Sequence, residues 1–169
     1  MKNCSIKIYF QIIMLMFSIS VLGQNENNKT MTSFVPKSKA YDIYYPKTFV
    51  LNEDNEGIVT ITDSASELNI TISSYGFDQE TTDEKLIQQL TEFVKNYHTK
   101  EITRENWKSY KTKFDILVEL KVSDEKANWV WWGVVNKKQL VLISINKKTP
   151  ISSEDTNLLQ FMINNMIIN

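Results

Sequence analysis

The sequence predicts an α+β fold in which an antiparallel sheet of about six to seven strands is combined with two helices. Short segments of alternating apolar and polar residues, separated by turn-rich stretches, are typical of half-buried strands. Two further segments have apolar residues at helical spacing, one in the middle of the chain and one at its C-terminal end. The resulting order is β-β-β-α-β-β-β-β-α. Because two helices are available to cover the two faces of a sheet, we expect a layered α/β/α arrangement.

The first 23 residues have the pattern of a secretory signal peptide. Two lysines supply a positive charge, residues 8–22 are mostly apolar, and the small residues Val21 and Gly23 precede a polar segment. We expect cleavage between Gly23 and Gln24. An uncleaved membrane anchor is the alternative, but the apolar run is shorter than the roughly 20 residues that span a bilayer. The sequence therefore predicts export to the periplasm or the extracellular space, with no stable membrane insertion after cleavage.

The rest of the chain is expected to form one domain. Residues 24–39 are polar and lack a periodic pattern, so we expect a tether before a single domain of residues 40–169. The only cysteine, Cys4, lies in the expected signal peptide, which leaves the exported chain without a disulfide or a thiol nucleophile. The charge is nearly balanced, with 19 basic and 20 acidic residues, and Arg104 is the only arginine. We therefore expect no binding to nucleic acid, which requires a basic surface.

The first half of the expected domain contains three strands and a helix. The strand pattern occurs in residues 41–45, 58–62 and 68–73. Short turns between these segments predict a meander. A capping box then begins at Thr81, whose hydroxyl is placed to bond the amide of Glu84, and the helix runs to about His98. Its apolar stripe, expected to be core, consists of Leu86, Ile87, Leu90, Phe93, Val94 and Tyr97.

The second half is expected to contain four strands and a closing helix. The strands are residues 107–111, 114–122, 129–135 and 140–145. In the second of them Asp115, Glu119 and Lys121 alternate with apolar residues, which predicts one solvent-exposed face. Residues 140–143 are all apolar, which predicts a strand covered on both faces. The helix begins with a capping signature at Ser152, and its stripe consists of Leu158, Leu159, Met162, Ile163, Met166 and Ile167.

One short motif and the order of the elements resemble a known family. Residues 44–49 read Tyr-Tyr-Pro-Lys-Thr-Phe and, with the strand of residues 58–62, resemble the "YP-x-x-aromatic" opening of PsbP-like domains. That fold group also contains the Mog-type Ran-binding proteins. The hairpin of residues 129–145 and the terminal helix resemble the closing elements of the family, although this chain has Thr48 and Phe49 where the family often has Gly-Trp. The resemblance covers about residues 40–169 and implies a non-catalytic binding or assembly module without a defined partner.

The residue types required for common catalytic and metal sites are scarce. His98 is the only histidine, and a histidine at the end of a helix is favoured there by the helix dipole. No G-x-S-x-G elbow is present, and one histidine is too few for a zinc site. An EF-hand-like spacing occurs at Asn52, Asp54, Glu56, Gly57 and Asp63, but strands flank it, so an acidic hairpin turn explains it better than calcium. We therefore expect no enzyme activity, cofactor or metal.

The tryptophans are the best candidates for contacts with a partner. Trp129 and Trp131 point to one face of their strand and Trp132 to the other. If a helix covers the face of Trp129 and Trp131, these rings are expected to be core, which is the commoner outcome. If that face is open, they are expected to form a platform for a sugar or a peptide. Trp107 and Tyr110 lie on the weak strand of residues 107–111, which is expected at an edge of the sheet and is therefore better placed for exposed contacts. The candidate partner-binding residues are Trp107, Tyr110, Trp129, Trp131 and Arg104.

Together these observations favour an exported, non-enzymatic module that binds a protein partner in the cell envelope or outside it. Two alternatives stay open. A glycan hydrolase would need two carboxylates facing each other in an aromatic-lined cleft. An immunity or inhibitor protein would show a flat acidic surface.

Overall fold

The computed structural model describes residues 31–169, so the expected signal peptide and its cleavage site lie outside the described residues. The strands are β1 (Met31–Phe34), β2 (Tyr41–Pro46), β3 (Val50–Glu53), β4 (Val59–Asp63), β5 (Leu68–Gly76), β6 (Trp107–Tyr110), β7 (Ile116–Ser123), β8 (Asn128–Asn136), β9 (Gln139–Lys147) and β10 (Ile167–Ile168). The helices of this part are α2 (Asp83–Val94) and α3 (Ser153–Asn165), with short 3₁₀ turns η1 (Lys95–Tyr97) and η2 (Arg104–Asn106). None of the described helices is long and apolar enough to span a bilayer.

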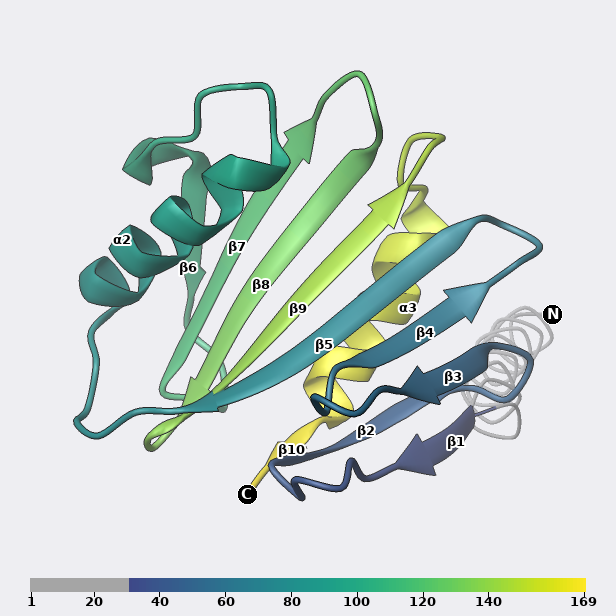
Figure 1. Cartoon of the computed structure of the whole chain (residues 1–169), viewed down its shortest axis with the longest axis horizontal. Helices are drawn as coiled ribbons and strands as arrows, with labels where there is room; N and C mark the ends of the chain where they lie inside the picture. Colours follow the sequence, from purple (N-terminus) through teal and green to yellow (C-terminus); the bar gives the residue numbers. More distant parts are fainter. Residues whose placement is uncertain (1–30) are drawn as a thin grey trace, which may run out of the picture.

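A seven-stranded antiparallel sheet forms the centre of the molecule, in the order β3-β4-β5-β9-β8-β7-β6. The helix α2 lies on one face, while α3 and a three-stranded sheet of the order β1-β2-β10 lie on the other (Figure 1). The expected α+β fold and its layered arrangement are confirmed. The strand β9 lies at the middle of the sheet and is buried on both faces, as the apolar run of residues 140–143 predicted.

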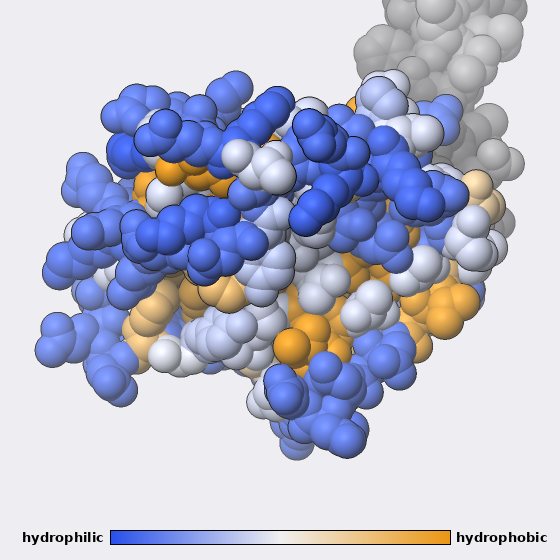
Figure 2. Space-filling view, turned by 45° about the horizontal axis from the view of Figure 1, so that its top comes forward, coloured by the Kyte–Doolittle hydropathy of each residue, from blue (hydrophilic) through white to orange (hydrophobic). Residues whose placement is uncertain are grey.

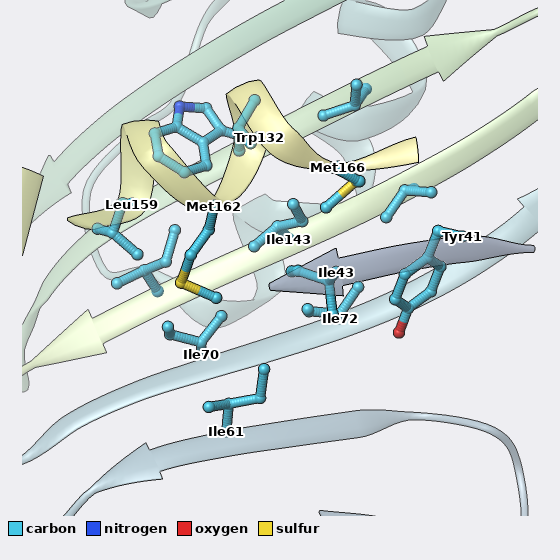
Figure 3. Packing of buried hydrophobic residues seen from close by; sticks show 14 of the residues in the cluster. Tyr41, Ile43, Ile61, Ile70, Ile72, Trp132, Ile143, Leu159, Met162 and Met166 are labelled. Carbon is cyan, nitrogen blue, oxygen red and sulfur yellow. The ribbon is translucent and has the colours of Figure 1, made fainter. Parts of the chain in front are cut away.

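The larger hydrophobic core lies between the sheet and α3. Alternate residues of the strands point to this side, so Ile61, Ile70 and Ile143 meet Met162 of α3 and Met166, which directly follows the helix (Figure 3). The small sheet contributes Tyr41 and Ile43 from β2 to this core, and both are almost completely buried (Figure 3). Leu159, Met162 and Ile163 of α3 and its C-cap Met166 are buried, so these members of the predicted stripe are confirmed as core. Ile167 was expected in the same stripe but lies in β10 and is exposed, because the helix ends before it.

The smaller core lies under α2 and places the helix close to the sheet. The helix buries Leu86, Ile87, Leu90 and Val94 against β7 and β8. Gly133 in β8 makes the close approach possible, because a Cβ atom at this position would lie only 2.6 Å from Cδ1 of Leu90.

Two predictions about the N-terminal half of the described chain are wrong. The expected tether of residues 24–39 contains the strand β1, which pairs with β2 from Met31 opposite Pro46 to Phe34 opposite Ile43. The strand of residues 41–45 leaves the meander and joins this small sheet, so the meander consists of β3, β4 and β5. The apolar side of β2 explains its position, since it packs on α3 rather than beside β3.

The helix α2 also differs in detail from its prediction. Its N-cap is Thr82, whose hydroxyl accepts from the amide of Lys85, and not Thr81. Phe93 and Tyr97 were expected in the core but are exposed. Phe93 lies at the margin of the buried stripe, and the chain tightens into a 3₁₀ turn after Val94, which moves Tyr97 away from that stripe.

The acidic segment between β3 and β4 is a hairpin turn, as expected. One carboxylate oxygen of Asp54 accepts from the amides of Glu56 and Ile58, both at 2.9 Å. Gly57 has a φ of 79°, which favours glycine. These contacts account for the residue pattern without a bound calcium ion.

Candidate functional site

A groove of about 290 Å³ opens between the strands β7 and β8 and the N-terminal end of α3. Its walls are mostly apolar, with polar side chains at the rim. The lining residues are Glu119, Lys121, Val122, Ser123, Asn128, Trp129, Val130, Trp132, Pro150, Ile151, Thr156 and Leu159. We call it the Glu119 groove, because this residue is the one carboxylate among its lining residues.

Glu119 is held in place by two neutral donors. The residue is only 7% exposed. The hydroxyl of Tyr110 donates to its Oε1 at 2.8 Å, and the indole N–H of Trp132 donates to its Oε2 at 3.0 Å. The ammonium group of Lys121 lies 3.4 Å from Oε1 on a side chain that is largely exposed. The carboxylate is therefore a fixed acceptor, while the side chain of its cationic neighbour Lys121 lies largely in solvent.

The register of the sheet produces this arrangement. Glu119 lies directly opposite Trp132 across the pair β7–β8, and Tyr110 in β6 reaches it diagonally from its position opposite Leu117. The exposed face predicted for β7 is therefore wrong at Glu119, because two large aromatic side chains cover it. Burial raises the pKa of the Tyr110 hydroxyl, as does its hydrogen bond to Glu119. Tyr110 thus keeps its proton and remains a donor near neutral pH.

A second network lies on the other face of the sheet, beneath α2. Trp129 and Trp131 stack with ring centroids 5.6 Å apart and an angle of 7° between the planes. The Nε1–H of Trp131 donates to Nε2 of His98 at 2.9 Å, while Nδ1 of His98 lies 2.9 Å from Oδ2 of Asp124. Because an indole N–H only donates, Nε2 accepts and the proton of His98 is on Nδ1, facing Asp124.

This network corrects the sequence interpretation of His98. The side chains of His98 and Asp124 have no solvent-exposed surface, so His98 is not a solvated group at a helix end. The helix dipole also fails to explain its position, since η1 ends before it and the backbone of His98 is extended. The residues beside it, Trp129 and Trp131, contact its ring edge to face. Its role in the structure is to connect the end of η1 to β8 and to the β7–β8 turn.

The structure separates the five residues that were predicted to bind a partner. Trp107 is only 3% exposed and packs under α2, so the exposed contact predicted for it is wrong. Trp131 is buried and Trp129 partly buried on the same face, in agreement with the core alternative. Tyr110 is 44% exposed and lies on the opposite face, beside the Glu119 groove. Arg104 is exposed in η2 and takes part in neither network.

Sequence reasoning missed the residues that define the groove and the buried network. A glutamate within an apolar strand is a signal for Glu119, but only the register with Trp132 and Tyr110 shows that it is buried. The pair of His98 and Asp124 is separated by 26 residues, and no local pattern connects them.

Comparison with known proteins shows the fold. No protein family matches the sequence, and no curated protein does. The solution structure of the cyanobacterial PsbP protein CyanoP from Synechocystis superposes with a TM-score of 0.61 at 10% identity, covering 83% of this chain and 93% of that one. The chain has a PsbP-like fold. A crystal structure from Bacteroides thetaiotaomicron is similar with a TM-score of 0.56 at 14% identity, covering 81% of this chain and 48% of that one. The PsbP-like resemblance noted in the sequence is therefore confirmed for the fold.

Proposed function

We propose that this chain is an exported, non-enzymatic binding module that holds a segment of a protein partner in the Glu119 groove. The PsbP-like fold is consistent with a binding or assembly role, although a fold alone does not determine function. The observation that carries the proposal is the fixed Glu119 carboxylate, which accepts from Tyr110 and Trp132 in a groove whose lining is more apolar than polar.

The size and the lining of the groove suit a single inserted side chain. Its volume of about 290 Å³ is just below the range for ligand pockets, which is roughly 300–1,000 Å³. The apolar residues Val130, Trp132 and Leu159 provide contacts for an aliphatic stem, and Glu119 provides a negative charge for its tip. A lysine or arginine of an extended partner segment has both features. Lys121 would turn toward solvent as the partner's cation enters.

The same geometry disfavours the two alternatives. A retaining or inverting glycosidase needs two carboxyl groups roughly 5–10 Å apart, and Glu119 is the one carboxylate lining the groove. Both of its oxygens also accept hydrogen bonds already, which suits a fixed charge better than a group that exchanges protons. An immunity protein would present an acidic patch, whereas the charged lining residues here are Glu119 and Lys121, one of each sign.

Site-specific photocrosslinking in the cell envelope tests this proposal. A benzoylphenylalanine residue replaces Thr156, which lines the groove in the first turns of α3, and a control variant carries it at the exposed Thr99. We expect a discrete protein adduct from position 156 and none from position 99. The substitution Glu119→Gln, which keeps the shape but removes the charge, should weaken the adduct at least tenfold. An absent adduct at position 156, or one unchanged by Glu119→Gln, would refute the groove as the binding site.

A further inference from the structure

The helix α2 covers only part of its face of the seven-stranded sheet. Its core cluster contains residues of β6, β7, β8 and β9, but no buried residue of β3, β4 or β5. In Figure 1 α2 lies over β6 and β7, while β5 and β4 are visible in front without a covering element. Within residues 31–169, this side of β3–β5 is therefore open.

The side chains on this open side form two rows across the strands. Backbone register places Asn52, Thr60, Thr71 and Ser144 opposite one another, and it does the same for Val50, Thr62, Asn69 and Asn146. Ser73 extends the surface toward Leu142. On the other side of the same strands, Val59, Ile61, Ile70 and Ile72 are buried in the main core. We call this surface of eight residues the open face; its members are Val50, Asn52, Thr60, Thr62, Asn69, Thr71, Ser73 and Asn146, while Ser144 at the end of the first row is buried.

An aromatic groove of about 240 Å³ adjoins the open face. It runs between α2 and the strands β5 and β9, and two of its rings, Tyr75 and Phe93, are 47% and 39% exposed. The pairs Ser73–Leu142 and Tyr75–Leu140 connect it directly to the open face. Its lining residues are Tyr75, Phe77, Leu86, Gln89, Leu90, Phe93, Leu140 and Leu142.

The combined surface contains no charged residue, although charged residues make up 23% of the chain. Acidic residues begin in the turns at the ends of the strands, such as Asp54 and Glu56 at one end and Glu67 at the other. Figure 2 shows pale and orange side chains gathered in the lower half of the view, below a band of blue ones. Exposed sheet surfaces usually carry charged side chains, which prevent association with other chains. The absence of charged side chains from a surface of this size therefore indicates that it binds something.

The chemistry of this surface matches an uncharged polyhydroxylated polymer. Threonine, serine and asparagine side chains both donate and accept hydrogen bonds, as sugar hydroxyls do. The C–H faces of sugar rings carry partial positive charge and pack well on the negative faces of aromatic rings such as Tyr75 and Phe93. A nucleic acid or an anionic polymer would need cations, which this surface lacks. A protein interface core would be more apolar than these two polar rows.

We infer that the open face and the aromatic groove together bind a neutral polysaccharide. Sugar rings pack on Tyr75 and Phe93, and their hydroxyls bond the rows that run through Thr60 and Thr71. This site lies on the opposite side of the sheet from the Glu119 groove, and it stands whether or not that groove binds a protein.

Native affinity electrophoresis tests the inference with defined probes. The protein is run in gels that contain laminarin, hydroxyethyl cellulose, galactomannan or dextran, and in a gel with the anionic polymer alginate. Each mobility is divided by the mobility in a gel without polymer. We expect retardation in at least one neutral gel and none in alginate. Thr71→Lys, in the middle of the open face, should abolish the retardation, and Tyr75→Ala should reduce it at least fivefold.

Matched variants and a second measurement keep the result unambiguous. Ser109→Lys introduces the same charge at an exposed position of the edge strand β6 and should be retarded like the unmodified protein. Circular dichroism checks that each variant is folded. The inference fails if no neutral polymer retards the protein, or if Thr71→Lys and Tyr75→Ala leave the retardation unchanged. It also fails if sedimentation shows a dimer that Thr71→Lys dissociates, because the open face would then be a contact between two copies.

Discussion

His98, Asp124 and Trp131 form a buried chain of hydrogen bonds that joins the end of η1, the β7–β8 turn and the strand β8. Each member depends on the others, because a donor or acceptor left without a partner inside the protein costs about 1–3 kcal/mol. Two exposed aromatic residues, Phe93 and Tyr97, also pack against Trp131. The network therefore fixes the position of Trp131 beneath α2.

Replacing His98 should destabilise the protein without affecting the Glu119 groove. His98→Ala leaves the indole N–H of Trp131 without an acceptor and Oδ2 of Asp124 without its donor, so we expect the free energy of unfolding to fall by about 1–3 kcal/mol. Urea denaturation measures this difference. Thr99→Ala changes the next residue, which is exposed, and should have no measurable effect. Equal stability of the two variants would contradict the structural role of His98.

The same network predicts how stability changes in acid. The hydrogen bond from His98 lowers the pKa of the Asp124 carboxyl, and the amides of Lys126 and Ala127 lower it further. A carboxyl group with a lowered pKa in the folded state stabilises the protein above its unfolded pKa of about 3.9, and this stabilisation is lost as the pH falls through the folded value. Asp124→Asn should therefore be less stable at pH 7 and should lose less stability between pH 5 and pH 3. Parallel pH profiles for the two proteins would rule this out.

At the scale of the elements, the contact of α2 with the sheet depends on Gly133. A methyl group at this position would approach Leu90 and Val118 to 2.6 and 3.1 Å, so the helix or its side chains would have to shift. We expect Gly133→Ala to cost about 1–3 kcal/mol, the usual penalty for overpacking a core. Thermal unfolding followed by circular dichroism measures the effect. Gly76→Ala is the matched control, because nothing lies within 4 Å of its added methyl group. Similar losses in both variants would contradict the tight packing of α2.

The start of α3 depends on a capping box at Ser152. Its hydroxyl accepts from the amide of Asp155 at 3.1 Å, and a carboxylate oxygen of Asp155 accepts from the amide of Ser152 at 2.8 Å and from Lys147 at 2.9 Å. Ser152→Ala should lower the free energy of unfolding by about 0.5–2 kcal/mol. Ser153→Ala, one residue into the helix, should be close to neutral in the same urea titration. A larger loss for Ser153→Ala would show that the cap has been assigned to the wrong residue.

The elements that sequence reasoning predicted correctly have local signals. The strand pattern of residues 129–145 and the capping signature at Ser152 are complete within a few residues, and the structure contains both. The strand β1 has no such signal, because it is stabilised by pairing with β2 and not by its own pattern. Glu119 was misjudged for the same physical reason. Its burial depends on Trp132 and Tyr110, which reach it from neighbouring strands.

For the whole molecule, the proposed export predicts a defined mature N-terminus. Mass spectrometry of the protein recovered from its native compartment should show a chain that begins at Gln24, in its free or cyclised form. A chain that retains Met1, or one that carries an added lipid mass, would contradict cleavage after Gly23.

The central functional prediction is that the protein binds its partner and leaves it chemically unchanged. The most direct test takes the partner captured from the Glu119 groove and titrates it with the purified protein in a calorimeter, followed by mass spectrometry of the recovered partner. We expect saturable binding, an affinity at least tenfold lower for Glu119→Gln, and an unchanged partner mass. A partner recovered with an altered mass after incubation with the unmodified protein, but not with Glu119→Gln, would show that the groove is an active site instead.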